Sequence, residues 1–178
     1  MEKEEKTDMV TIILPGYSSS NREWLEAMAK GIGGDSEIRP IYWAHWSDPL
    51  KKFDPKSKAD LLDGISGKRV VNIIAKSIGT LAASYLIQKS PQKIGKVIFC
   101  GIPLGNLNEE NKEVIKNALK KIPPSNFICF QNDEDPYGGI DSVRSLISEF
   151  GNNLKVVKKQ RSDHEYFYLE DFKRFLLD

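Results

Sequence analysis

The hydrophobic positions of this chain fall into short runs separated by longer amphipathic stretches. Five runs are rich in β-branched residues and have the length of buried strands. They are Val10–Leu14, Arg69–Ala75, Lys96–Cys100, Asn126–Phe130 and Leu154–Val157. A sixth run, Glu37–Trp43, contains Pro40, which cannot donate to a central ladder, so we predict this strand at an edge of the sheet.

The stretches between these runs carry apolar residues at helical spacing. Ser20 and Glu23 have the spacing of a capping box, and Gly31 is placed to end the helix that follows. Further stripes predict helices at Leu81, Ala82, Tyr85 and Leu86, at Ile115, Leu119 and Ile122, at Val143, Leu146, Ile147 and Phe150, and at Leu169, Phe172 and Leu176. Alternating strands and helices predict an α/β fold: a three-layer sandwich with a mostly parallel, twisted sheet of about six strands and helices on both faces.

Length and composition predict one domain over residues 9–178, preceded by a disordered tail over residues 1–8. Lys and Arg total 26 against 25 for Asp and Glu, which leaves no field of one sign to attract nucleic acid or an anionic membrane. No apolar run reaches about 18 residues, and no apolar segment follows the charged N-terminus. We therefore expect a cytoplasmic protein whose partner is a small molecule.

The stretch "VVNIIAKSIGTLAASYL", residues 71–87, joins a predicted strand to a predicted helix through Ser77. A serine before a helix is commonly an N-terminal cap. It can also be a nucleophile, because ligands bind beyond the carboxyl ends of the strands in parallel sheets. A nucleophilic serine needs a histidine to take its proton and a third group to orient that histidine.

Only two histidines are available to serve Ser77. His164 follows the last predicted strand and His45 follows the edge strand, so both are expected near the carboxyl edge of the sheet. Asp133 and Asp135 follow the fifth run and supply carboxylates at the same edge. The sequence has no C-x-x-C or H-E-x-x-H motif, and two histidines are too few for a histidine-rich metal site, so we expect no cofactor and no metal.

The order Ser77, Asp135, His164, together with an A-x-S-x-G strand-to-helix turn, resembles the α/β-hydrolase family. The resemblance covers nearly the whole chain and implies a small, lidless serine hydrolase. It favours Asp135 over Asp133 as the acid, because the family usually has a glycine three residues before its acid. Asn132 stands at that place for Asp135, and asparagine tolerates a left-handed backbone better than most residues.

The segment "ILPGYSSS" resembles the turn after the first conserved strand of the family, with Pro15 where histidine is usual and Gly16 retained. The resemblance implies that the backbone N–H groups of Tyr17 and Ile78 form an oxyanion hole. Ala75 replaces the first glycine of the family motif, which adds a single methyl group at a position that must be small.

Four residues on predicted carboxyl-edge loops are candidates for the wall of a substrate pocket. They are Trp43, His45, Trp46 and Tyr137. Lys76, next to the serine, is expected to be solvated. Cys100 and Cys129 end or nearly end apolar runs and are expected to be buried thiols rather than nucleophiles or disulfide partners.

These features predict a serine hydrolase that cleaves a small carboxylic ester or thioester through an acyl-enzyme on Ser77. An amidase or peptidase is a second hypothesis, because it uses the same triad. A third hypothesis is a non-catalytic, hydrolase-like binding or scaffold protein. The departures at Ala75 and Pro15 favour the third hypothesis, and the intact triad opposes it.

Overall fold

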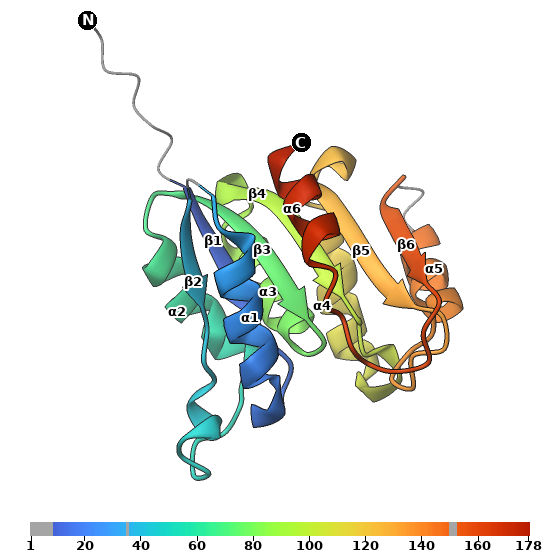
Figure 1. Ribbon diagram of the computed structural model, residues 1–178, viewed down its shortest axis with the longest axis horizontal. Coiled ribbons are helices and arrows are strands. Elements are labelled where there is room, and N and C mark those ends of the chain that lie inside the picture. The colour runs from blue at the N-terminus through green and yellow to red at the C-terminus, as the bar shows by residue number, and fades with distance from the viewer. Residues whose placement is uncertain (1–8, 35, 150–152) are drawn as a thin grey trace, which may run out of the picture.

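The computed structural model describes residues 9–34, 36–149 and 153–178, and both the tail predicted over residues 1–8 and Phe150 lie outside them. The strands in this part of the chain form one parallel sheet with the order β2-β1-β3-β4-β5-β6 (Figure 1). They are β1 Met9–Leu14, β2 Glu37–Pro40, β3 Val70–Lys76, β4 Ile94–Cys100, β5 Phe127–Asn132 and β6 Lys155–Lys159. The predicted α/β fold is therefore confirmed, with every described pairing parallel.

Helices cover both faces of this sheet (Figure 1). They are α1 Arg22–Ile32, α2 Pro55–Ser66, α3 Gly79–Lys89, α4 Glu109–Leu119, α5 Ile140–Ser148 and α6 Leu169–Leu177. Helices α1 and α6 pack on one face, and α2 to α5 pack on the other, which gives the predicted three layers. None of the described helices combines the length and the apolar character needed to cross a membrane.

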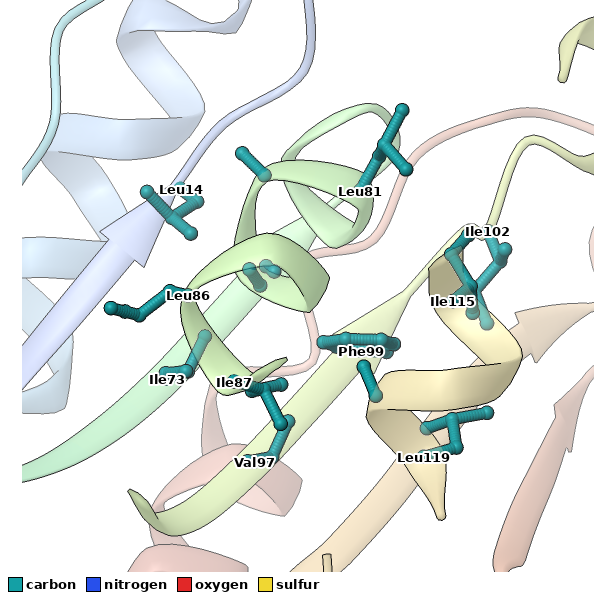
Figure 2. Packing of buried hydrophobic residues seen from close by; sticks show 14 of the residues in the cluster. Leu14, Ile73, Leu81, Leu86, Ile87, Val97, Phe99, Ile102, Ile115 and Leu119 are labelled. Atoms are coloured by element: carbon teal, nitrogen blue, oxygen red, sulfur yellow. The ribbon is translucent and has the colours of Figure 1, made fainter. Parts of the chain in front are cut away.

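Each face of the sheet has its own apolar core, because successive side chains of a strand point to opposite faces. On β3, Ile73 belongs to the core under α2 to α5, while Ile74 belongs to the core under α1 and α6. Figure 2 shows the first of these cores, where Phe99 of β4 lies near Ile115 of α4. This two-sided burial explains why the central strands read as continuous apolar runs in the sequence.

The two edge strands depart from the sequence prediction in their extent and burial. The edge position of β2 is confirmed, but the strand ends at Pro40, and Trp43 precedes a short 3-10 helix over Ala44–Trp46. Strand β6 is partly exposed rather than buried, because it has a neighbouring strand on one side only. Lysines along β6 suit such an open edge, since charged side chains discourage pairing with another chain.

Helix α1 does not use the predicted capping box. It begins after Asn21, which makes no side-chain cap hydrogen bond, and Ser18 instead caps the 3-10 helix Ser19–Asn21. The predicted stop at Gly31 is also wrong, because the helix continues to Ile32 and ends at Gly33, whose φ is +56°. Gly33 combines this φ with a ψ of −155°, a backbone that essentially only glycine adopts, and it therefore ends the helix.

Helix α2 is absent from the sequence prediction, although its ends carry clear signals. Asp54 accepts a hydrogen bond from the Lys56 N–H at 3.1 Å, and Pro55 occupies the first turn. Gly67, with φ +60°, follows the last turn. The helix shows a weak apolar stripe, with Ala59 and Leu62 facing the core. Capping residues therefore mark α2 better than periodicity does.

Candidate active site

The strand order reverses between β1 and β3, and this places two loops side by side at one edge of the sheet. From β1 the chain passes to β2 on one side, and from β3 it proceeds through β4 and β5 to β6 on the other. Leu14 is paired with Ala75, so the segment Pro15–Tyr17 and Ser77 emerge next to each other. A reversal of this kind is where parallel α/β sheets open a crevice for ligands.

Ser77 lies in a sharp turn between β3 and α3. Its φ is +55°, the one positive φ at a non-glycine residue in the described chain, and such a backbone costs about 1–3 kcal/mol. The Thr80 hydroxyl and N–H both donate to the Ser77 carbonyl, at 2.7 and 2.9 Å, and hold the turn. A Cβ at Gly79 would lie 2.5 Å from the Leu14 carbonyl oxygen, so the helix requires glycine to approach β1. The N-cap position of α3 belongs to Ile78, which argues against Ser77 as the helix cap.

Asp135 and His164 reach this edge from two different loops. Asp135 follows β5, and His164 lies between β6 and α6. Nδ1 of His164 is 2.7 Å from Oδ2 of Asp135. A carboxylate oxygen accepts hydrogen bonds, so Nδ1 carries the proton and Nε2 of the neutral ring keeps its lone pair. Nε2 is buried and has no hydrogen-bond partner among the described residues.

Two further donors surround the Asp135 carboxylate, whose side chain is fully buried. The Tyr137 N–H donates to Oδ1 at 2.8 Å, and the Tyr166 hydroxyl donates to Oδ2 at 2.5 Å. Burial, and after it the hydrogen bond to Asp135, raises the pKa of Tyr166, so this hydroxyl keeps its proton. The donors replace the water that a buried carboxylate has lost. Sequence reasoning missed Tyr166. The one feature of the sequence that could have indicated its role is its position two residues after His164.

Asn132 connects the acid loop to the histidine loop. Its side-chain amide donates to the carbonyl oxygens of Asp163 at 2.8 Å and Glu165 at 3.0 Å, the residues on either side of His164. The Tyr168 hydroxyl donates to Oδ1 of Asn132 at 2.6 Å. Asn132 ends β5 without a positive φ, so its tolerance of a left-handed backbone is not used here. The site uses the side chain of this asparagine rather than its conformational tolerance.

The Cys100–Gly101 peptide at the end of β4 contacts both the serine and the histidine. The Cys100 carbonyl accepts a hydrogen bond from the Ser77 N–H at 2.9 Å. The His164 ring lies against Gly101, where an added Cβ would be 3.0 Å from Cε1 and would also strike the ring of Tyr166. Gly101 has φ +64°, so its backbone and its neighbours both require glycine. Ser77 and His164 therefore both contact the segment Cys100–Gly101.

Aromatic residues of the loop after β2 hold the loop after β1. Nε1 of Trp43 donates to the carbonyl oxygens of Gly16 at 3.0 Å and Pro15 at 3.2 Å. Because the C=O and N–H of a trans peptide point in opposite directions, the Tyr17 N–H is directed away from this indole. The N–H of Ile78 stands at the N-terminus of α3, where backbone donors have no intrahelical partner.

The Tyr17 carbonyl is fixed by two donors. Nε2 of His45 and Nε1 of Trp46 each lie 2.7 Å from this oxygen, so Nε2 of His45 carries a proton. The rings of His45 and Tyr17 are stacked with their centroids 4.4 Å apart. We call His45 and Trp46, which both lie in the 3-10 helix Ala44–Trp46, the aromatic clamp.

A cavity of about 390 Å³ opens at this edge, and Ser77 and His164 both line it. Of the four residues expected on a pocket wall, Tyr137 lines the cavity. Trp43 and the aromatic clamp contact the backbone of the loop after β1 instead. The wall also includes Trp24, Asn106 and Glu165, which sequence reasoning did not single out.

Lys76 lines the same cavity and is not solvated, so the sequence-based expectation for it is wrong. The residue is 3% exposed. Its ammonium lies 5.4 Å from the centre of the Trp24 ring and 3.3 Å from Oε2 of Glu165. A long side chain at the end of a central strand is covered by α1 and by the histidine loop, which local sequence does not reveal.

Both cysteines are free and buried, as predicted. Burial raises the pKa of the Cys100 thiol to about 12. Burial likewise raises the pKa of Cys129 well above its ordinary value. Neither thiol is a nucleophile at neutral pH, because the thiolate is the reactive form.

Solved structures of hydrolases share this fold. The chain superposes on a pyrethroid hydrolase from Sphingobium faniae with a TM-score of 0.64 and 13% identity, covering 96% of each chain. A YdeN-like putative hydrolase from Pectobacterium atrosepticum gives a TM-score of 0.63 and 15% identity over 94% of this chain and 90% of that one. RedJ, a thioesterase from the prodiginine pathway of Streptomyces coelicolor, gives a TM-score of 0.53 and 13% identity over 96% of this chain and 82% of that one. The chain therefore has the α/β-hydrolase fold.

No protein-family model matches the chain, and no curated protein matches it.

Proposed function

We propose that this protein is a serine hydrolase that cleaves a small carboxylic ester or thioester through an acyl-enzyme on Ser77. The observation that carries the proposal is the Asp135–His164 pair, in which Nδ1 donates to a buried carboxylate and leaves a buried, unpartnered Nε2 at the cavity that Ser77 lines. A base with its lone pair free beside a strained serine turn is the arrangement that nucleophilic catalysis needs.

In the proposed first step, Ser77 Oγ attacks the substrate carbonyl carbon while Nε2 of His164 takes the hydroxyl proton. Asp135 holds the tautomer and stabilises the imidazolium that forms. The tetrahedral intermediate then collapses: the bond from carbon to the leaving oxygen or sulfur breaks, and His164 returns its proton to that atom. Water attacks the remaining acyl-enzyme by the same route, which releases a carboxylic acid and restores the serine.

The negative charge that develops on the carbonyl oxygen would be stabilised by the N–H groups of Tyr17 and Ile78. Each such donor contributes about 3–4 kcal/mol to lowering the barrier in serine hydrolases. The Trp43 hydrogen bond to the Gly16 carbonyl supports the orientation of the first donor. The N-terminal end of α3 supports the second, because the helix dipole places partial positive charge there.

Cleavage of an amide or peptide bond is a second candidate, because these groups would form the same intermediate. A binding or scaffold role is less well supported, because it leaves the strained backbone of Ser77 and the buried Nε2 of His164 without a purpose.

A fluorophosphonate probe tests the proposal directly, since it labels only an activated serine. We expect stoichiometric labelling at Ser77, and labelling that falls to background in Ser77→Ala and by at least about a hundredfold in rate in His164→Ala. Ser142, a serine on α5 that does not line the cavity with Ser77, gives the matched control Ser142→Ala, which should label as fast as the unaltered protein. Absence of labelling in folded protein would overturn the hydrolase proposal and favour the scaffold hypothesis.

A further inference from the structure

Lys76 carries a charge that is buried beside the nucleophile and is weakly compensated. Its side chain is 4% exposed, and it lines the cavity together with Ser77. Burying an ammonium is costly unless carboxylates or other acceptors replace its water.

The partners of the Lys76 ammonium are few. In the described chain it has one hydrogen-bond acceptor, Oε2 of Glu165 at 3.3 Å, and the Trp24 ring lies 5.4 Å away. By comparison, the ammonium groups of Lys93 and Lys159 each lie 2.7 Å from a carboxylate. The Glu165 side chain is 65% exposed, so water screens it and it is free to turn away.

We propose that Lys76 binds an anionic group of the substrate, and that the Glu165 carboxylate pairs with the Lys76 ammonium only while the cavity holds no such group. This inference rests on the proposed hydrolase function and names its substrate class: an ester or thioester with a carboxylate or similar anion a few bonds from the scissile carbonyl. Lys76 directly precedes Ser77 in the chain and both line the cavity, so an anion on Lys76 stays close to the reacting carbon.

The anion has two possible places in the substrate, the acyl group or the leaving group. The acyl arm of the test compares 4-nitrophenyl hemiglutarate with 4-nitrophenyl pentanoate, in which a methyl group replaces the carboxylate. The leaving-group arm compares the butyrate ester of 4-hydroxyphenylacetate with that of 4-hydroxyphenylacetamide. In the arm that matches the natural substrate, we expect kcat/KM at least about tenfold higher for the anionic ester.

Two variants at this ion pair should act in opposite directions. Lys76→Met should reduce the anionic-to-neutral ratio of kcat/KM by about tenfold or more. Glu165→Gln should raise the ratio, because it removes the competing carboxylate and one negative charge from the cavity. A purely structural ion pair would not give opposite shifts, and the Glu165 variant keeps the test valid if Lys76→Met folds poorly.

Lys96→Met is the matched control. Lys96 is also a lysine on a central strand with its ammonium over an aromatic ring, 4.9 Å from the centre of Phe175, but it does not line the cavity. Its replacement should leave the ratio unchanged. A ratio near one in both arms for the unaltered protein, or equal shifts in the Lys76 and Lys96 variants, would overturn the inference.

Calorimetric titration separates this inference from the proposed function. Glutarate should bind the Ser77→Ala variant and should bind at least about tenfold more weakly when Lys76→Met is added. Binding without any ester hydrolysis by the unaltered protein would overturn the hydrolase proposal alone. Hydrolysis of neutral esters without glutarate binding or an anionic preference would overturn the role of Lys76 alone.

Discussion

At the scale of single residues, the site depends on the carboxylate of Asp135. Three donors converge on it: the Tyr137 N–H, the Tyr166 hydroxyl and Nδ1 of His164. They fix the carboxylate in a place that water does not reach, and the carboxylate in turn fixes the imidazole. Histidine orientation is therefore set by a network from two loops rather than by one pair.

We predict that Asp135→Asn lowers kcat for a short ester by about 10³ to 10⁴, because the amide no longer holds the histidine in the reactive tautomer. The fold should survive, since the amide has nearly the same size. Steady-state kinetics measures the loss of kcat, and thermal unfolding checks that the variant is folded.

Asp133 provides the control for this prediction. It lies two residues away and forms an ion pair with Lys158 at 3.2 Å on the surface, outside the cavity. Asp133→Asn should change kcat less than about threefold. If the two variants exchanged effects, Asp133 would be the acid.

Residue types and their order in the chain were enough to predict that Asp135 and His164 meet at this edge of the sheet. They did not predict the contacts that Asn132 and Lys76 make there. Asn132 was picked for its place three residues before the acid, and its contacts to the histidine loop span about 31 residues of sequence. Lys76 was expected in solvent, because nothing local indicates that α1 and the histidine loop cover it. Such contacts depend on how distant loops pack, and a single sequence does not encode them in a readable pattern.

At the scale of elements, the loops after β1 and β2 act together. The aromatic clamp, His45 and Trp46, donates twice to the Tyr17 carbonyl, so either donor alone satisfies that oxygen. The clamp thereby holds the segment that would supply an oxyanion N–H. Its residues were candidates for the wall of a substrate pocket, whereas the structure places them against the backbone of the loop after β1 and outside the cavity lining.

We predict that His45→Phe and Trp46→Phe each reduce kcat by less than about threefold, and that the double variant loses at least about thirtyfold. The double variant should lose more than the two single losses combined, because each single variant leaves one hydrogen-bond donor on the Tyr17 carbonyl and the double variant leaves none. A double-mutant cycle on kcat and KM measures the coupling. A rise in KM with kcat unchanged would instead mean that His45 contacts substrate.

At the scale of the whole molecule, the connection after β4 contributes Asn106 to the cavity wall, but none of the residues of its α-helix lines the cavity. It contains a short 3-10 helix, Leu104–Asn106, and α4, whose Ile115, Ala118 and Leu119 are fully buried. These residues are used to pack α4 beside α3, so the helix is not available as a lid. The open cavity of about 390 Å³ can surround only a small acyl group.

We predict that kcat/KM for neutral 4-nitrophenyl esters peaks between about C2 and C6. Each buried methylene contributes about 0.8 kcal/mol, and methylenes beyond the cavity stay in water and contribute little. A chain-length series in monomeric protein provides the measurement. A steady rise of kcat/KM through long-chain esters would contradict the inference that no lid covers the cavity.

The order of strands and helices, and with it the layered fold, followed from patterns that repeat along the chain. The central strands are apolar on both faces and are easy to recognise, and α4 to α6 have clear apolar stripes, whereas α3 is buried on most of its sides. Edges were harder: β2 is shorter than expected and β6 is half exposed, because an edge strand needs less apolar surface. Helix α2 lacks a strong stripe and was missed, although Asp54 and Gly67 mark its two ends.

The burial of Cys100 and Cys129 has a practical consequence for following this protein in solution. Both thiols lie in adjacent central strands, paired through Phe99 with Cys129 and Cys100 with Phe130, and both are held protonated by burial. Cys129 lies in the core under α2 to α5 and Cys100 in the core under α1 and α6, so alkylating reagents find no reactive sulfur until the covering helices separate from the sheet. The rate at which these thiols react therefore reports how often the folded molecule opens, at a place next to the segment Cys100–Gly101 that contacts Ser77 and His164.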